Sequence, residues 1–230
     1  MTNEFAGFPP ALLRFLAELE INNQRDWFNA NKGRYEQNIV APGLAFISAM
    51  ATELARFAPR FRALPLRSGG SLMRIYRDTR FARDKKPYKT NVGIQFRHEQ
   101  GTDVHAPAYY FHIDCRETFV GAGAWRPPSS ALTAIRERID EHPRTWLAAR
   151  DDADFASRFI LSGESLMRPP RGYGGNHPMI ADLKRKSFIA IHHLQHDDLS
   201  EPALVSRVGD AFQNATPFMK FLCDAVGVPF

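Results

Sequence analysis

Three short stretches decide the fold of this 230-residue chain: VGIQFR (residues 92–97), YYFHID (109–114) and ETFVGAGAW (117–125). In the first two, apolar and polar side chains alternate, which is the period of a β-strand with one buried face. The glycines of the third allow a bulge or a close backbone approach. Because the connections between the stretches are too short for crossover helices, the sequence predicts an antiparallel sheet.

Two more strands are predicted, SLMRIYR (71–77) and SFIAIHHL (187–194). Helical periodicity precedes the strands, since apolar residues between positions 12 and 19 recur at the spacing i, i+3, i+4, i+7. A second helix is expected to begin at an asparagine cap, Asn22 or Asn23. Pro42 is expected to begin a third.

The chain after residue 126 is predicted to be mostly helical. Helices are expected through residues 132–139, from Pro143, and from Leu204 onward with a break at Thr216. The Gly- and Pro-rich stretch RPPRGYGGNHP (168–178) is predicted to be an irregular loop, of a kind that often carries function. The sequence therefore predicts a single α+β domain over residues 1–230, with an antiparallel sheet flanked by N-terminal and C-terminal helices.

The composition is that of a globular protein, with 44% hydrophobic and 24% charged residues. No apolar run approaches the about 18 residues of a membrane span, and residues 1–10 lack the pattern of a secretory signal. Cys115 and Cys223 are too far apart to indicate a disulfide framework or zinc-site spacing, which predicts two reduced thiols. We therefore expect a cytoplasmic protein without membrane contact.

The positive charge is concentrated in RIYRDTRFARDKKPYKT (residues 74–90), hereafter the basic segment. Between Arg74 and Lys89 lie seven Lys or Arg and two Asp, a balance of +5 that equals the formal net charge of the whole protein. Arginines three residues apart would repel each other on a helix, and Pro87 disfavours helical angles at Lys86. The basic segment is therefore predicted to be a strand that leads into a basic loop.

Arginine holds phosphate or carboxylate bidentately and lysine offers a mobile point charge, so the basic segment is predicted to bind a phosphate-bearing ligand. Asp78 and Asp84 would position the arginines or a hydrated metal. The alternative is a solvated turn in which the two aspartates pair locally with the arginines. The residues assigned to ligand binding are Arg74, Arg77, Asp78, Arg80, Arg83, Asp84, Lys86, Tyr88 and Lys89.

Candidate catalytic residues lie on the second strand of the sheet. Tyr110, His112 and Asp114 project to the same side, and a carboxylate beside a histidine can orient the imidazole for proton transfer. His112 and Asp114 are therefore the predicted acid–base pair, with a structural histidine as the alternative. Gln95 and Arg97 join them if the neighbouring strand pairs in a suitable register.

The histidines and glycines form no metal or cofactor motif of a familiar spacing. The adjacent His192 and His193 diverge on a strand, His196 lies beyond its end, and no HExxH motif or carboxylate triad accompanies them. The glycines of GAGAW and GYGGN match neither a phosphate loop nor a dinucleotide fingerprint. No metal site is predicted, and the sequence names no cofactor.

Four motifs in this order resemble a known family: NNQRDWFNANKGRYE (22–36), the basic segment, YYFHIDCRETFVGAGAW (109–125) and DLKRKSF (182–188). The chain is similar to the bacterial and fungal family known as domain of unknown function 2461, from about Phe8 to Leu222. The resemblance implies a family-like core over residues 7–225 and a basic segment that works as one element. It implies no activity, cofactor or catalytic residue.

The sequence thus predicts a protein that binds a nucleotide, a sugar phosphate or a nucleic-acid end through the basic segment, and it leaves open whether the protein is an enzyme. The expected partners are anionic small molecules or nucleic acid. One alternative is a nucleic-acid-binding module without catalysis. The other is a scaffold or interaction protein whose arginines form internal salt bridges.

Overall fold

The computed structural model describes residues 4–101 and 107–230, and these form one α+β domain around an antiparallel sheet. Within the described residues the sheet has six strands in the order β1-β2-β3-β4-β6-β5. Four of them confirm predicted strands, β2, β3, β4 and β6. The strands are β1 (Phe61–Arg62), β2 (Val92–His98), β3 (Ala108–Ile113), β4 (Thr118–Ala124), β5 (Ile160–Ser162) and β6 (Phe188–Leu194).

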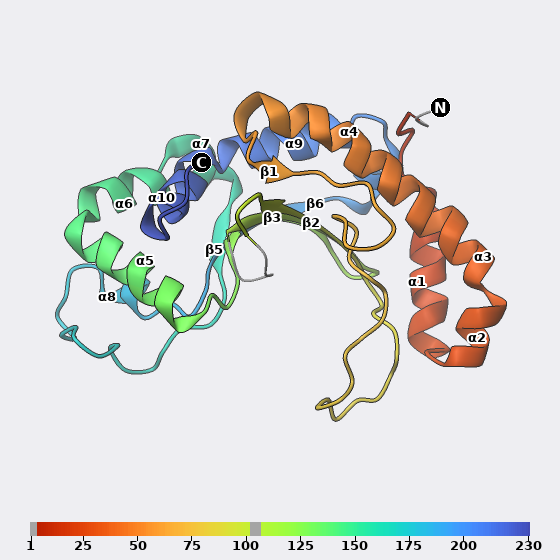
Figure 1. The fold of residues 1–230 in the computed structure, drawn as a ribbon, viewed down its shortest axis with the longest axis horizontal. Helices are drawn as coiled ribbons and strands as arrows, with labels where there is room; N and C mark the ends of the chain where they lie inside the picture. Colours follow the sequence, from red (N-terminus) through yellow and green to blue (C-terminus); the bar gives the residue numbers. More distant parts are fainter. Residues whose placement is uncertain (1–3, 102–106) are drawn as a thin grey trace.

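The alternation in the sequence separates the two faces of this sheet. One face packs into the core, where Phe111 of β3 contacts Phe46 with ring centroids 5.1 Å apart and Phe96 of β2 contacts Phe212 at 5.8 Å. Helices cover this face, while the sheet arches away from them and leaves its concave face uncovered by helices (Figure 1). The register places Gln95 opposite Tyr110 and Tyr110 opposite Gly121, all on the concave face.

The N-terminal helices are α1 (Ala11–Ile21), α2 (Arg25–Ala30), α3 (Lys32–Tyr35), the π-helix η1 (Glu36–Val40) and α4 (Ala41–Phe57). α4 begins at Ala41 with Pro42 in its first turn, as predicted, but it continues directly from α3 and η1 without a break. A proline inside a helix removes one hydrogen bond and crowds the preceding turn. The wider π-turn of η1 lies in that preceding turn, where it relieves the crowding.

The asparagine cap predicted for the second helix is wrong. Gln24 occupies the cap position of α2. Asn22 instead donates to the Glu18 carbonyl at the end of α1. Asn23 is buried, and its side chain donates to the Tyr88 carbonyl and accepts from the Tyr88 N–H, both at 3.0 Å. Asn23 therefore holds the returning arm of the basic segment against the N-terminal helices.

The helices predicted after β4 are confirmed, and shorter elements lie between them. α9 and α10 both pack on β4; α9 also packs against α4, and α10 packs against α5 and α6 (Figure 1). The stretch 168–178 is irregular, as predicted. The elements are α5 (Ser129–Glu141), α6 (Pro143–Arg150), α7 (Ala153–Arg158), α8 (Ile180–Leu183), the short helix η2 (His196–Ser200), α9 (Leu204–Asn214) and α10 (Thr216–Ala225).

The continuous helix from Lys32 to Phe57 is long and apolar enough to cross a membrane by length and composition alone. Its apolar stripe is buried in the protein, however, with Phe46, Ile47 and Met50 fully covered. Burial of one stripe inside the protein is typical of a core helix.

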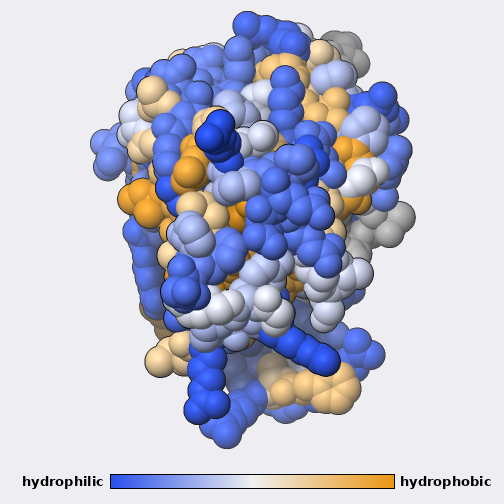
Figure 2. Space-filling model, turned by 90° about the vertical axis from the view of Figure 1, so that its left-hand side faces the viewer, coloured by the Kyte–Doolittle hydropathy of each residue, from blue (hydrophilic) through white to orange (hydrophobic). Residues whose placement is uncertain are grey.

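The predicted strand 71–77 forms isolated bridges rather than a full strand. Leu72 pairs with Ile94 at the edge of β2, and Tyr76 pairs with Tyr88 across the two arms of the basic segment. Beyond this second bridge the basic segment leaves the sheet and projects beside α1–α3 (Figure 1). It forms the lowest part of the molecule, where hydrophilic residues dominate the surface (Figure 2).

Candidate functional site

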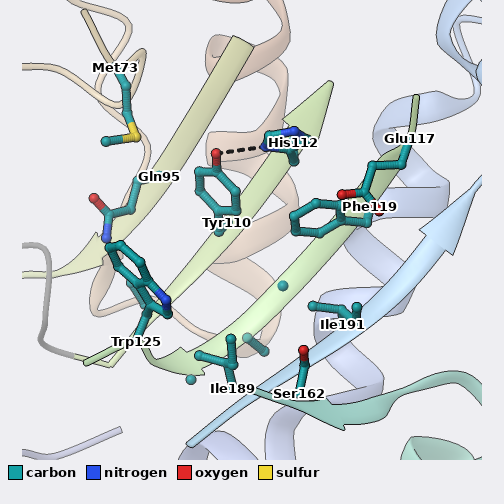
Figure 3. Close-up of a pocket in the computed structure, with 14 residues that line it drawn as sticks. Met73, Gln95, Tyr110, His112, Glu117, Phe119, Trp125, Ser162, Ile189 and Ile191 are labelled. Atoms are coloured by element: carbon teal, nitrogen blue, oxygen red, sulfur yellow. Dashed lines mark hydrogen bonds between the residues drawn. The ribbon is translucent and has the colours of Figure 1, made fainter. Parts of the chain in front are cut away.

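A cavity of about 450 Å³ lies on the concave face of the sheet. Every strand from β2 to β6 contributes to its lining (Figure 3). Its apolar walls are Met73, Phe119, Trp125, Ile189 and Ile191. Its polar side chains are Gln95, Tyr110, His112, Glu117 and Ser162. A mostly apolar hollow with a few convergent polar groups is the usual form of a small-molecule site.

Three of the polar side chains predicted on β3 form a chain of hydrogen bonds at one end of this cavity. The Tyr110 hydroxyl lies 3.0 Å from Nδ1 of His112 (Figure 3), and Nε2 of His112 lies 3.2 Å from Oδ2 of Asp114. The structure therefore brings the predicted pair together and adds Tyr110 to it. Gln95 lies opposite Tyr110 as expected, and Arg97 donates to the Gln95 side chain at 3.0 Å.

The local turn explains the charge state of Asp114. Burial acts to raise the pKa of this carboxyl, but hydrogen bonds from the backbone N–H of Glu117 and Arg116, and from the His112 ring, outweigh burial and hold the pKa below its ordinary value. An ionised carboxylate can only accept hydrogen bonds. Nε2 of His112 therefore carries a hydrogen and donates to Asp114, and in this tautomer Nδ1 is the acceptor of the Tyr110 hydroxyl.

Tyr110 is the donor at the cavity end of this chain. Burial, with a smaller effect from the Asp114 charge, raises the pKa of Tyr110 to about 12, so its hydroxyl keeps its proton at neutral pH. The His112 ring stacks on Phe119 with centroids 4.6 Å apart and planes 13° apart. Stacking on one face and hydrogen bonds at both nitrogens fix the orientation of the imidazole.

Several residues of the site were missed by the sequence analysis. Glu117 and Phe119 line the cavity beside His112, and Trp125 closes its other end next to Gln95 (Figure 3). Glu117 and Phe119 could have been found from the same alternation as in β3. Every second residue of β4, such as Phe119 and Gly121, faces the same side as Tyr110, and Glu117 continues this series one step before the strand. Ser162 had no such signal, because it comes from an unpredicted strand. Met73 lies in the predicted strand 71–77, which forms only isolated bridges at Leu72 and Tyr76.

Two arginines of the basic segment form ion pairs with the two aspartates of the same segment. Arg77 pairs with Asp84 at 2.8 Å and also donates to the Lys86 carbonyl. Arg80 pairs with Asp78 at 2.7 Å, and this interaction lowers the pKa of Asp78 to about 2. Local pairing of both aspartates, which was the alternative to ligand binding, is therefore present.

Other cations of the basic segment have no carboxylate partner within 4.0 Å among the described residues. The Lys89 pKa is lowered, first by burial and then by the nearby charge of Arg74. Tyr88, predicted to bind ligand, is 3% exposed and stacks on Phe28 with centroids 4.2 Å apart, so its ring anchors the segment. The cations without such a partner are Arg74, Arg83, Lys85, Lys86 and Lys89.

A second, polar hollow of about 320 Å³ lies at the base of the basic segment. Arg77 and Thr79 border it from the segment, and Arg25 and Asn29 border it from α2. Arg25 was not among the predicted ligand-binding residues, because its proximity to Arg77 depends on the packing of α2 against the basic segment. The hollow joins two guanidinium groups with a hydroxyl and an amide, a donor set suited to an oxyanion.

Comparison with known proteins adds a family but no activity. No curated protein matches the chain, and no solved structure matches it. The profile of a family described as "Conserved hypothetical protein (DUF2461)" matches residues 11–221, which include every strand of the sheet, the cavity and the basic segment. The chain belongs to this family, DUF2461.

Proposed function

We propose that the concave cavity binds a small organic ligand with an apolar body and one polar, hydrogen-bonding end. The observation that carries this proposal is the meeting of an apolar hollow of about 450 Å³ with the Tyr110–His112–Asp114 chain at one end. The volume falls within the range of about 300–1,000 Å³ that is usual for small-molecule pockets.

The walls define the ligand chemistry. Phe119, Ile189 and Ile191 offer a flat apolar surface, and Trp125 offers an aromatic face at the far end (Figure 3). The Tyr110 hydroxyl gives its one hydrogen to Nδ1 of His112, so its oxygen suits a ligand O–H or N–H that donates a hydrogen bond. His112 and Asp114 form the rest of this polar end, and their part in any reaction remains a prediction.

Gly121 offers a direct test, because it lies on the cavity floor between β3 and β6. A Cβ at this position would meet its nearest atom, in the Tyr110 side chain, at 3.7 Å, an ordinary contact. The Cβ of Gly121→Val therefore fits, and its two methyl groups should fill part of the cavity, with an unchanged melting temperature as the check that it folds. The matched control is Gly175→Val, in the loop 168–178, where the nearest atom would be 3.9 Å away.

The measurement is ligand-observed NMR with a library of small, mostly apolar compounds that carry one hydroxyl, amide or amine group. We expect compounds that bind the native protein and Gly175→Val to lose at least about tenfold in affinity for Gly121→Val, because the valine occupies their space. The proposal is refuted if the compounds bind all three proteins with equal affinity. It is also refuted if no compound binds the native protein and none changes its melting temperature.

The second candidate function is the predicted binding of a phosphate-bearing ligand by the basic segment. The polar hollow that joins Arg77 with Arg25 supports it, while the ion pairs of Arg77 and Arg80 support the scaffold alternative. Inorganic phosphate, nucleotides and sugar phosphates should raise the melting temperature. A ligand present at a hundred times its dissociation constant should add about 2.7 kcal/mol to the free energy of unfolding.

Arg25→Gln should abolish that stabilisation, and Arg144→Gln, at an exposed arginine of α6 outside the basic segment, should not. Log-linear weakening of nucleic-acid binding with salt would favour the nucleic-acid-binding alternative. If none of these anions changes the melting temperature, the result counts against both phosphate-ligand binding and nucleic-acid binding by the basic segment.

A further inference from the structure

The hairpin between β3 and β4 gathers three metal-ligating side chains at the polar end of the cavity. His112 lies near the end of β3, Asp114 directly follows that strand, and Glu117 directly precedes β4. One donor atom from each lies within 4.8 Å of the other two. We infer that this end of the cavity binds a divalent first-row cation such as Zn²⁺ or Mn²⁺, through His112, Asp114 and Glu117.

The donor spacing fits a single ion. Nε2 of His112 and Oδ2 of Asp114 are 3.2 Å apart. Two ligands bound at about 2.1 Å to one tetrahedral ion lie about 3.4 Å apart, so these two atoms are already at coordination spacing. The Glu117 side chain is 45% exposed, so it can turn the short distance needed to complete the set.

The type of donor sets the class of ion. One imidazole and two carboxylates suit Zn²⁺, Mn²⁺ or Fe²⁺ and not Cu⁺, which prefers thiolates. The one cysteine nearby, Cys115, directs its thiol to the Leu13 carbonyl at 3.5 Å and so takes no part. His112 and Glu117 both line the cavity, so the remaining coordination positions face the cavity, as in catalytic rather than structural sites.

Each of the three proposed ligands is in turn contacted by a neighbouring group, as ligands in metal sites usually are. The backbone N–H groups of Arg116 and Glu117 donate to Oδ1 of Asp114 at 2.7 and 2.8 Å, which leaves Oδ2 for the ion. Tyr110 occupies Nδ1 of His112, and His193 lies 3.6 Å from the Glu117 carboxylate. Metal-bound histidines almost always place their second nitrogen against such a partner.

Metal binding should reverse one hydrogen bond. Without metal, Nε2 of His112 carries the hydrogen and Nδ1 accepts from Tyr110. A metal on Nε2 requires the hydrogen on Nδ1, which then donates to the Tyr110 oxygen. The Tyr110 hydroxyl stays protonated and can then turn its hydrogen toward the cavity, where it can donate to a ligand.

Metal binding can be tested separately from the proposed function, because the measurement needs only the metal ion and no organic ligand. Isothermal titration calorimetry of the full chain with ZnCl₂ and with MnCl₂ should show one saturable site for at least one of them. Glu117→Gln, an exposed change that keeps the backbone contact to Asp114, should weaken binding at least about tenfold. Tyr110→Phe, at a positioning residue, should weaken it by about 10- to 100-fold.

The matched control is Asp140→Asn, which breaks another His–carboxylate pair, with His177 at 2.9 Å, and should leave affinity unchanged. Nitrogen-15 NMR of His112 should report the hydrogen moving from Nε2 to Nδ1 on saturation. A protein that binds neither ion, or Glu117→Gln with native affinity, overturns the inference. A protein that binds no metal ion could still bind an organic ligand in the cavity, and the comparison with Gly121→Val would still test that binding.

Discussion

The Tyr110 hydroxyl lies over Gly93, the residue that pairs with His112 across β2 and β3. A Cβ on Gly93 would come within 2.8 Å of the Tyr110 oxygen and 3.1 Å of the Met73 sulfur. The missing side chain at position 93 therefore provides the space in which Tyr110 reaches His112. Glycine is unfavourable in a strand by propensity, and this close approach explains its presence at position 93.

Gly93→Ala should force Tyr110 out of its position and break its hydrogen bond to His112. We expect a loss of about 1–3 kcal/mol in the free energy of unfolding, which is usual for overpacking, measured by urea denaturation. Gly121→Ala is the control, because its Cβ makes only ordinary contacts. Equal stability of the two variants would show that Tyr110 does not need the space above Gly93.

Asp182 should be among the most important polar residues for stability. Its side chain is 5% exposed, accepts from Arg150 at 2.6 Å and from the Trp146 indole at 2.8 Å, and lies 3.5 Å from Arg185. Asp182→Ala leaves a guanidinium without its buried partner, so we expect a loss of about 3–5 kcal/mol in urea denaturation.

Asp151 gives the matched comparison, because it pairs with the same Arg150 at 2.7 Å but is 55% exposed. Asp151→Ala should cost less than about 1 kcal/mol, as exposed ion pairs do. If the two variants lose the same stability, burial is not what makes the Asp182 contacts important.

The Glu18–Arg34 pair should make stability depend on acid pH. Arg34 donates to both carboxylate oxygens, at 2.6 and 2.8 Å, and joins α1 to α3. These hydrogen bonds lower the Glu18 pKa in the folded state. Since the unfolded chain then binds the proton more readily, the pair stabilises the fold above about pH 4.3 and loses this contribution as pH falls through the lower folded pKa.

Arg34→Met removes the pair and keeps most of the aliphatic contact. We expect its stability deficit relative to the native protein to be full at pH 7 and to shrink below pH 4, measured by denaturant titrations across this range. A deficit that stays constant with pH would mean that Arg34 acts through its contact with Phe15 and not through charge.

Arg80→Ala separates the ligand and scaffold interpretations of the basic segment. The Arg80 and Asp78 side chains are 78% and 49% exposed, so their pair should contribute less than about 1 kcal/mol. Thermal melts should therefore be nearly unchanged. A loss well beyond this value would make the basic segment a stabilising network, as the scaffold interpretation requires.

Much of the fold could be predicted because hydrophobic periodicity is a local property. The alternation in β2 and β3 reports which side chains face the helices, and the i, i+3, i+4 pattern does so for α1. The predictions failed where a contact from elsewhere in the chain decides the structure. Asn23 is a helix cap by its residue type, but its amide is satisfied by Tyr88, 65 residues away in sequence.

The sequence alone determined the antiparallel sheet, the concentration of charge in residues 74–90 and the common face of Tyr110, His112 and Asp114, because these follow from spacing along the chain. Only the tertiary structure decided which strands lie side by side, and so that Glu117, Trp125 and Ser162 join that face around one cavity. It also decided that Arg77 meets both Asp84 and the neighbourhood of Arg25. Contacts of this kind depend on the path of the whole chain, which no local pattern encodes.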